Sequence, residues 1–184
     1  CNTLAKENSE ELRFVKRNPK DLLNVKPPFP RLSYDQVVKH LQDKGVQLRY
    51  GDDLGWEQEK QIASEYTTPF FVTGYPKSAK AFYHKLDPRN PDLTLSADLL
   101  APEGYGEIIG GGQRIDDLQE LMGRIRENNL NPEDYRWYVD LRRFGSAPHS
   151  GFGLGIERML AWICKLDHIR DAIAFPRLIN RVYP

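Results

Sequence analysis

The sequence contains little cysteine, with only Cys1 and Cys164 among 184 residues. Two cysteines cannot form the disulfide framework of a small secreted protein, and we expect Cys164 to act as a small buried hydrophobe. No stretch approaches the roughly 20 consecutive apolar residues of a membrane span. The first residues also lack the basic and then apolar pattern of a signal peptide. We therefore expect a protein of the reducing cytoplasm without a membrane partner.

Neither sign of charge is in excess, because 26 Lys and Arg balance 26 Asp and Glu. Proteins that coat nucleic acid without sequence preference depend on clustered positive charge, so this class is excluded. A local basic patch or a separate domain that binds RNA is still compatible with the balance. Hydrophobic residues make up 40% of the chain and charged residues 28%, which is typical of a globular domain with an apolar core.

Local sequence signals predict the secondary structure of the first part of the chain. We expect residues 1–30 to be a connector or the end of a helix, because they are polar and their last five include three prolines. Ser33 followed by Gln36 is the capping-box pattern and predicts a helix directly afterwards. Asp53 is expected to cap a second helix over roughly residues 55–65.

The rest of the chain alternates between β-rich runs and amphipathic segments. A hairpin loop is expected at residues 87–92, and amphipathic helices are expected around residues 115–125, after Asn131 and after Gly155. Hairpins and helices without a strict βαβ alternation favour an α+β fold, with an antiparallel sheet flanked by helices. The predicted strands are residues 70–73, 80–85, 93–100 and 107–109, the last ending in three glycines.

Two carboxylates, Asp98 and Glu107, flank this glycine run on neighbouring predicted strands. Mg²⁺ takes one or two carboxylates and completes its ligand set with phosphate oxygens and water. Glycines allow a ligand to approach the backbone closely. The pattern therefore indicates a site for Mg²⁺ and phosphates, and the alternative is a solvated pair of acids beside a glycine-rich turn.

Two arginines follow glycine-rich segments. Arg114 carries the planar guanidinium that clamps a carboxylate or a side-chain carbonyl, although it is also well placed for a surface ion pair with the aspartates that follow it. Arg158 lies in the first turn of a predicted helix, where backbone N–H groups favour anions. The alternative for Arg158 is an ion pair with a neighbouring acid.

His149 stands alone in the sequence. No cysteine or second histidine lies at zinc-ligand spacing, and no nucleophile is paired with it as in a catalytic triad. We interpret His149 either as a polar residue at the end of a strand or as a substrate contact.

Taken in order, these segments resemble the asparaginyl-tRNA synthetases, which are class II aminoacyl-tRNA synthetases. The similarity extends from about residue 14 to the C-terminus and includes Gly74-Tyr75-Pro76 and Phe175-Pro176-Arg177. One departure is Gly112, where the asparaginyl pattern usually has Ser. The segments that carry the resemblance are GEIIGGGQR (106–114), DLRRFGSAPH (140–149) and SGFGLGIER (150–158).

The resemblance implies a role for each candidate residue. Glu107 and Asp98 would hold a Mg²⁺ that bridges the phosphates of ATP, and Glu107 and Arg158 would be the catalytic residues. Arg114 would grip the side-chain carbonyl of the amino acid, and Gly110 replaces a metal-binding Ser of aspartyl relatives. The remaining implied contacts are Gly155, Ile156, Glu157 and Arg158 for ATP, and Gly110, His149 and Gly151 for the amino acid.

The implied reaction is attack of the amino-acid carboxylate on the α-phosphate of ATP, followed by acyl transfer to the 3′ end of tRNA. This chemistry needs positioning and charge stabilisation more than a general base. Arg114 serves asparagine or aspartate equally well, whereas Gly110 argues against an aspartyl enzyme. The expected partners are thus ATP, asparagine or aspartate, and the tRNA acceptor end.

The anticodon-binding barrel, motif 1 and motif 2 of the family do not appear in the sequence. We therefore expect residues 1–184 to be one partial catalytic domain of an asparagine–tRNA ligase, which as a complete enzyme is expected to be a homodimer. Two alternatives share these motifs. One is a paralogue that makes asparagine from aspartyl-adenylate and ammonia, and the other is a non-catalytic binding module.

Overall fold

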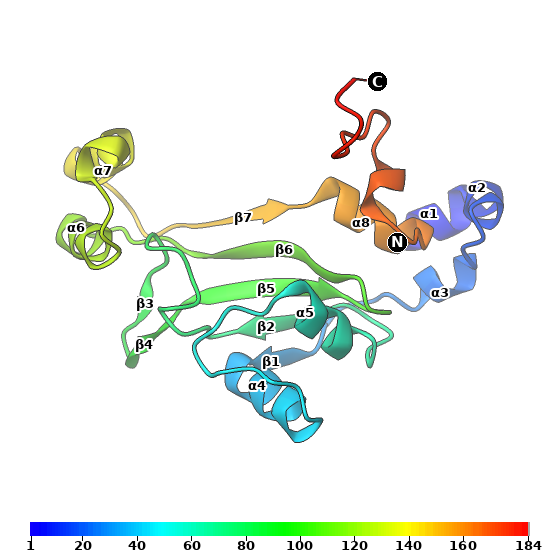
Figure 1. Ribbon diagram of the computed structural model, residues 1–184, viewed down its shortest axis with the longest axis horizontal. Helices are drawn as coiled ribbons and strands as arrows, with labels where there is room; N and C mark the ends of the chain where they lie inside the picture. Colours follow the sequence, from blue (N-terminus) through cyan, green and yellow to red (C-terminus); the bar gives the residue numbers. More distant parts are fainter. Residues whose placement is uncertain (184) are drawn as a thin grey trace.

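A five-stranded sheet forms the centre of the computed structural model, which describes residues 1–183 (Figure 1). The strand order is β1-β2-β5-β6-β7, and β1 pairs with β2 in parallel while all the other pairs are antiparallel. The predicted α+β fold is confirmed, with one parallel pair at its edge. The strands are β1 (Arg31–Ser33), β2 (Phe70–Thr73), β5 (Ser96–Ala101), β6 (Gly106–Gln113) and β7 (Ser150–Leu154).

A short hairpin of β3 (Leu86–Asp87) and β4 (Asn90–Thr94) lies beside the sheet. The prediction of a strand over residues 80–85 was wrong, because this segment forms turns, and its main chain pairs only through an isolated bridge between His84 and Arg114. Phe82 turns inward and packs with Ile115 in a hydrophobic cluster, which takes the chain out of the sheet plane.

Eight α-helices and two 3₁₀ turns surround the sheet within the described residues. The capping box of α4 is present as predicted, since Ser33 Oγ accepts from the Gln36 N–H and Gln36 Oε1 accepts from the Ser33 N–H. Asp53 does not cap α5, whose N-cap is Gly55, because its carboxylate accepts from the adjacent Leu54 N–H instead. The elements are α1 (Asn2–Glu7), α2 (Ser9–Phe14), α3 (Pro19–Leu23), α4 (Tyr34–Asp43), α5 (Trp56–Ala63), α6 (Leu118–Glu127), η1 (Pro132–Tyr135), α7 (Arg136–Arg143), α8 (Ile156–Cys164) and η2 (Ile169–Ala172).

The first 30 residues, expected to be a connector or the end of a helix, carry the three short helices α1 to α3, and residues 24–30 follow them without a helix. Leu12 and Leu22 are buried and join a cluster with Ile108 of β6 and Trp162 of α8. Burial of these leucines is favourable by about 1.5–3 kcal/mol each, so the segment packs on the sheet instead of only leading into it.

The two faces of β5 serve different cores because successive side chains of a strand point to opposite faces. Leu100 belongs to a cluster with α4 and α5. Leu99 and Ala101 belong to the cluster with α1, α3 and α8. A third cluster, between α6 and α7, lies at the far end of the sheet (Figure 1). β5 therefore packs against a hydrophobic core on each of its faces.

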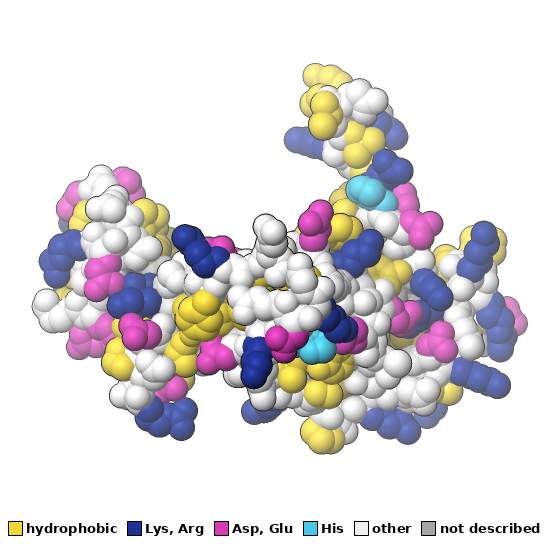
Figure 2. All heavy atoms as spheres, turned by 60° about the horizontal axis from the view of Figure 1, so that its bottom comes forward, with side chains coloured by type: hydrophobic (Ala, Val, Ile, Leu, Met, Phe, Trp, Pro, Cys, Tyr) yellow, Lys and Arg dark blue, Asp and Glu magenta, His cyan; other side chains and the backbone are white. Residues whose placement is uncertain are grey.

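The surface does not gather charge of one sign on the face seen in Figure 2, where basic, acidic and hydrophobic side chains are interspersed. This agrees with the zero formal net charge. Among the described residues, none of the helices combines the length and the apolar character that crossing a membrane requires.

Candidate active site

A β-bulge in β6 determines which side chains face the candidate site. The pairing of β5 with β6 shifts by one residue between Leu99 and Leu100, so Ile108 and Ile109 both point into the core under the sheet. A bulge of this kind re-aims the neighbouring side chain. Glu107 consequently lies on the same face as Gly110, which is opposite Asp98.

The glycine run lies inside β6 and not after it, which corrects the prediction that the strand ends at Ile109. A side chain at Gly110 would place its Cβ 2.6 Å from Glu107 Oε1 and 3.5 Å from Asp98 Oδ1. The two predicted metal-binding carboxylates therefore converge on a cradle that exists only because residue 110 has no side chain.

This cradle is part of a pocket of about 300 Å³. Four of the predicted site residues line it, namely Asp98, Glu107, Gly110 and Arg114. Its other lining residues are Asp53, Ala79, Lys80, Ala81, Tyr83, His84 and Gly111. The sequence did not single out Lys80 for a role of its own.

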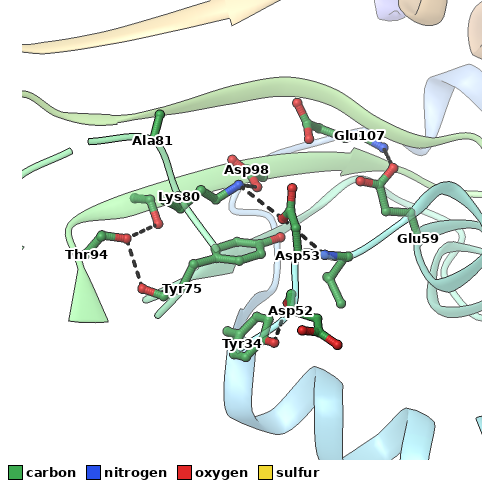
Figure 3. Close-up of polar contacts among 12 residues, drawn as sticks. Tyr34, Asp52, Asp53, Glu59, Tyr75, Lys80, Ala81, Thr94, Asp98 and Glu107 are labelled. Atoms are coloured by element: carbon green, nitrogen blue, oxygen red, sulfur yellow. Dashed lines mark hydrogen bonds and ion pairs between the residues drawn. The ribbon is translucent and has the colours of Figure 1, made fainter. Parts of the chain in front are cut away.

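Lys80 neutralises Asp98 at the base of this pocket (Figure 3). Asp98 is only 2% exposed, and its Oδ2 accepts a hydrogen bond from Lys80 Nζ. The ammonium also lies 3.9 Å from the centre of the Tyr75 ring and 3.9 Å from Asp53 Oδ1. Burial raises the pKa of Asp53, and Lys80 opposes this rise. Only Oδ1 of Asp98 is thus left for a further ligand.

Glu59 of α5 supports Glu107 from below, as Figure 3 shows. Its Oε2 accepts from the Glu107 N–H at 2.9 Å. Burial raises the pKa of Glu59 to about 7, and the hydrogen bond from Glu107 opposes the rise. Sequence reasoning missed Glu59, although its spacing from Ile62 and Ala63 places it on the buried stripe of the helix.

The carboxyl group of Glu107 itself is half-buried and has no cationic hydrogen-bond partner within residues 1–183. Burial raises its pKa, and the charge of Asp98 raises it further, while Lys80 and Arg158 oppose the rise. A positively charged ligand would relieve both effects, because it favours the ionised carboxylate.

Arg114 contacts uncharged groups. Its guanidinium carbon lies 4.6 Å from the centre of the Tyr83 ring, and its Nη1 is 3.4 Å from Nε2 of His84. Its Nη2 lies 3.1 Å from the position that a Cβ of Gly151 would occupy. The expected alternative of an ion pair with Asp116 is not observed, because Asp116 pairs with Lys85.

Arg158 lies in the first turn of α8 as predicted, and its Nη1 donates to the backbone oxygen of Glu107 at 2.9 Å. It does not line the pocket that contains Arg114. Instead it borders a second pocket of about 410 Å³, together with Trp56, Lys60 and Tyr105. The two candidate catalytic residues are therefore joined through the main chain of β6.

The remaining candidates lie around these groups. His149 is exposed, its Nδ1 lies 2.7 Å from the Ala147 oxygen, and its own backbone oxygen accepts from the Arg114 N–H. Gly155 is the N-cap of α8, and Ile156 and Glu157 are exposed in its first turn. None of these four residues lines the pocket of Arg114.

Comparison with known proteins assigns the family. The model of the family described as tRNA synthetases class II (D, K and N) matches residues 2–179, so the chain belongs to this family. The asparagine–tRNA ligase of Pyrococcus furiosus is 55% identical over 175 residues, which are 95% of this chain and 40% of that protein. The chain thus spans about 40% of the length of the curated relatives it matches.

Solved structures agree with this assignment. Asparaginyl-tRNA synthetase from Pyrococcus horikoshii complexed with asparaginyl-adenylate superimposes with a TM-score of 0.93 and 54% identity, covering 99% of this chain and 42% of that chain. An aspartyl-tRNA synthetase from Entamoeba histolytica superimposes with a TM-score of 0.78 and 32% identity, covering 87% of this chain and 34% of that chain. The chain is therefore more similar to the asparaginyl than to the aspartyl structure.

Proposed function

We propose that residues 1–184 form part of a single class II catalytic domain, the C-terminal portion of an asparagine–tRNA ligase. The observation that carries this proposal is one pocket in which Arg114, without an acidic partner in the described residues, lies opposite Glu107 and Asp98. The asparagine–tRNA ligases among the relatives support it further.

The charges of the pocket favour an amide over a carboxylate side chain. Lys80 is already neutralised by Asp98, which leaves Arg114 as the cation available to a substrate within the described residues. Aspartate would require a second unpaired cation opposite its other oxygen, whereas the carbonyl of asparagine requires only one donor group. Arg114 would bind this carbonyl, with Gly151 leaving room beside the guanidinium.

Glu107 and Asp98 fit a hard cation. Their oxygens converge on the cradle at Gly110, and Mg²⁺ prefers one or two carboxylates with phosphate oxygens as its other ligands. Within residues 1–183 no group of three or more His, Cys, Asp and Glu side chains is suited to hold a metal on its own. The bound Mg²⁺ would neutralise phosphate charge.

ATP would occupy the region between Glu107 and the start of α8. Gly155, Ile156 and Glu157 would border the nucleotide, and Arg158 would provide positive charge to its phosphates, since a helix N-terminus and an arginine both favour anions. Catalysis would consist of holding the asparagine carboxylate near the α-phosphate and stabilising the charge that develops. His149, at the end of β7, remains a proposed contact of the amino acid.

In the complete enzyme, the partners proposed are the acceptor end of tRNA, which receives the asparaginyl group, and a second copy of the enzyme. The proposed location is the cytoplasm. The family membership and the curated names of relatives support the tRNA partner, and the second copy is what the resemblance to asparaginyl-tRNA synthetases implies.

ATP–pyrophosphate exchange tests the proposed function, with asparagine and aspartate as competing substrates. We expect little exchange from the 184 residues alone. A chimera in which they replace the matching segment of the Pyrococcus furiosus relative should exchange with asparagine, and the unmodified relative is the control. Exchange driven by aspartate, or none in a folded chimera, would contradict the proposal. Formation of free asparagine from aspartate and ammonia would identify the paralogue instead.

A further inference from the structure

His84 is a buried histidine that the proposed reaction does not yet use. It is 6% exposed and lies in the segment that crosses the end of β6. Backbone hydrogen bonds join Lys85 to Gln113 and Ile115 to Tyr83 on either side of it. The position of this imidazole relative to β6 is therefore fixed by the main chain.

The two ring nitrogens of His84 face groups of opposite hydrogen-bonding character. Nδ1 is 3.3 Å from the carbonyl oxygen of Ala81, and Nε2 is 3.4 Å from Nη1 of Arg114. A carbonyl can only accept and a guanidinium can only donate. Both contacts are satisfied by the neutral ring that carries its proton on Nδ1.

The charges around the ring favour the same form. Burial lowers the pKa of His84 below its ordinary value of 6.5, and the charges of Arg114 and Lys80 lower it further. The hydrogen bond to Ala81 and the charge of Asp98 oppose this shift. The ring is therefore neutral at pH 7.

Packing holds the imidazole against the strand beside the guanidinium. A Cβ at Gly112 would lie 2.7 Å from Cδ2 of His84, and also 2.8 Å from the Leu95 oxygen, so the ring lies directly on the strand. The Tyr83 ring covers one side of the Arg114 guanidinium. The imidazole thus packs against β6, and the guanidinium packs against the Tyr83 ring.

We propose that His84 is a positioning residue, whose Nε2 orients the Arg114 guanidinium toward the side chain of the amino acid without neutralising its charge. This inference rests on the proposed function, in which Arg114 contacts the substrate. A carboxylate in place of His84 would also orient Arg114, but it would compete with the substrate for the positive charge.

Two substitutions in the complete synthetase proposed above separate this role from simple packing. His84→Gln keeps an acceptor near the position of Nε2, whereas His84→Leu has a similar size and no acceptor. We expect His84→Leu to raise the KM for asparagine about fivefold to tenfold, because the guanidinium loses the acceptor that orients it. The KM for ATP and kcat should stay within about twofold, and His84→Gln should restore most of the affinity for asparagine.

The pH profile provides an independent readout. Protonation of His84 removes the acceptor and repels Arg114, so the wild-type KM for asparagine should rise as the pH falls below 6.5. His84→Gln should lack this rise. An unchanged KM in His84→Leu, or equal losses in both variants, would overturn the inference. If the wild-type synthetase shows no exchange with asparagine, the proposed function fails first and this inference with it.

Should His84→Leu not fold, nitrogen-detected NMR of the unmodified 184-residue chain still decides the hydrogen-bond arrangement. The expected spectrum at pH 7 is that of a neutral ring protonated on Nδ1. A charged ring at pH 7, or a proton on Nε2, would overturn the proposed arrangement.

Discussion

The two ends of the pocket beside β6 carry opposite charges. At one end, Arg114 is surrounded by uncharged groups and keeps its positive charge. At the other, Glu107 neighbours the acid Asp98, and Arg158 contacts only its backbone oxygen.

Between these ends, Lys80 and Asp98 neutralise each other in the interior. The charges of this central pair offset each other, whereas the charges at the two ends have no such partner among the described residues and are the ones proposed to meet ligands. Substitutions at the centre should therefore affect stability, and substitutions at the ends should affect activity.

The largest effect is expected at the central pair. Lys80→Met leaves Asp98 buried without its partner and should lower the free energy of unfolding by roughly 3–5 kcal/mol, measured by urea denaturation. The double variant Lys80→Met/Asp98→Leu should recover most of this loss, because it removes both charges. A single variant that costs under about 1 kcal/mol would show that the pair is not structural.

At the acidic end, Glu107→Gln in the chimeric synthetase should reduce ATP–pyrophosphate exchange about 100-fold, equivalent to roughly 2.7 kcal/mol, because the carboxylate proposed to hold Mg²⁺ is lost. Thermal stability should be unchanged or slightly higher, since a half-buried charge without a cationic partner is removed. Raising the Mg²⁺ concentration should not restore activity. A variant that fails to fold would show that Glu107 supports the fold, which contradicts the contrast between the centre and the ends of the pocket.

Arg158→Ala in the chimeric synthetase should lower kcat/KM for ATP at least roughly 30-fold. This corresponds to a loss of about 2 kcal/mol of transition-state stabilisation, as for a charge-assisted contact. Arg143→Ala is a matched control, because Arg143 is an exposed arginine that pairs with Asp140. The control should leave exchange kinetics unchanged. Wild-type kinetics in Arg158→Ala would remove Arg158 from the site.

Arg114→Ala in the chimeric synthetase should lower kcat/KM for asparagine roughly tenfold, which corresponds to about 1.5 kcal/mol. The fall in kcat/KM for ATP should be smaller. Arg114→Lys keeps the charge but not the planar fork, so it should recover only part of the loss. Steady-state exchange with each substrate varied in turn measures both effects. Equal losses for asparagine and ATP would contradict the assignment of Arg114 to the amino acid.

Much of the fold could be predicted where the signal is local. The Ser33 capping box and the strand at residues 70–73 depend on neighbouring residues and were correct. The failures depend on distant contacts. Helices α1 to α3 pack through Leu12 and Leu22 against strands far along the chain, and residues 80–85 leave the sheet because Phe82 joins a core built by later helices.

The site was predictable to a similar degree. The order of glycines, acids and arginines along the sequence indicated Glu107, Asp98 and Arg114 as site residues. These three residues line one pocket, and their roles remain predictions. The supporting residues Glu59 and His84 were missed, because the buried stripe of α5 does not reveal that Glu59 contacts Glu107, and only the fold brings His84 to Arg114. The bulge that turns Glu107 toward Asp98 also has no signature in the sequence.

The glycines of β6 beside this pocket restrict which substitutions the pocket tolerates. A Cβ at Gly111 or Gly112 would come within 2.7 Å of a neighbouring side chain, and a Cβ at Gly110 would displace the Glu107 carboxylate. A side chain at these positions, such as the Ser that the family pattern places at 112, therefore requires the neighbouring groups to shift with it. Diversity in a directed-evolution library belongs at exposed wall positions such as Ala81, where a substitution alters the shape of the pocket without removing a buried partner of the sheet.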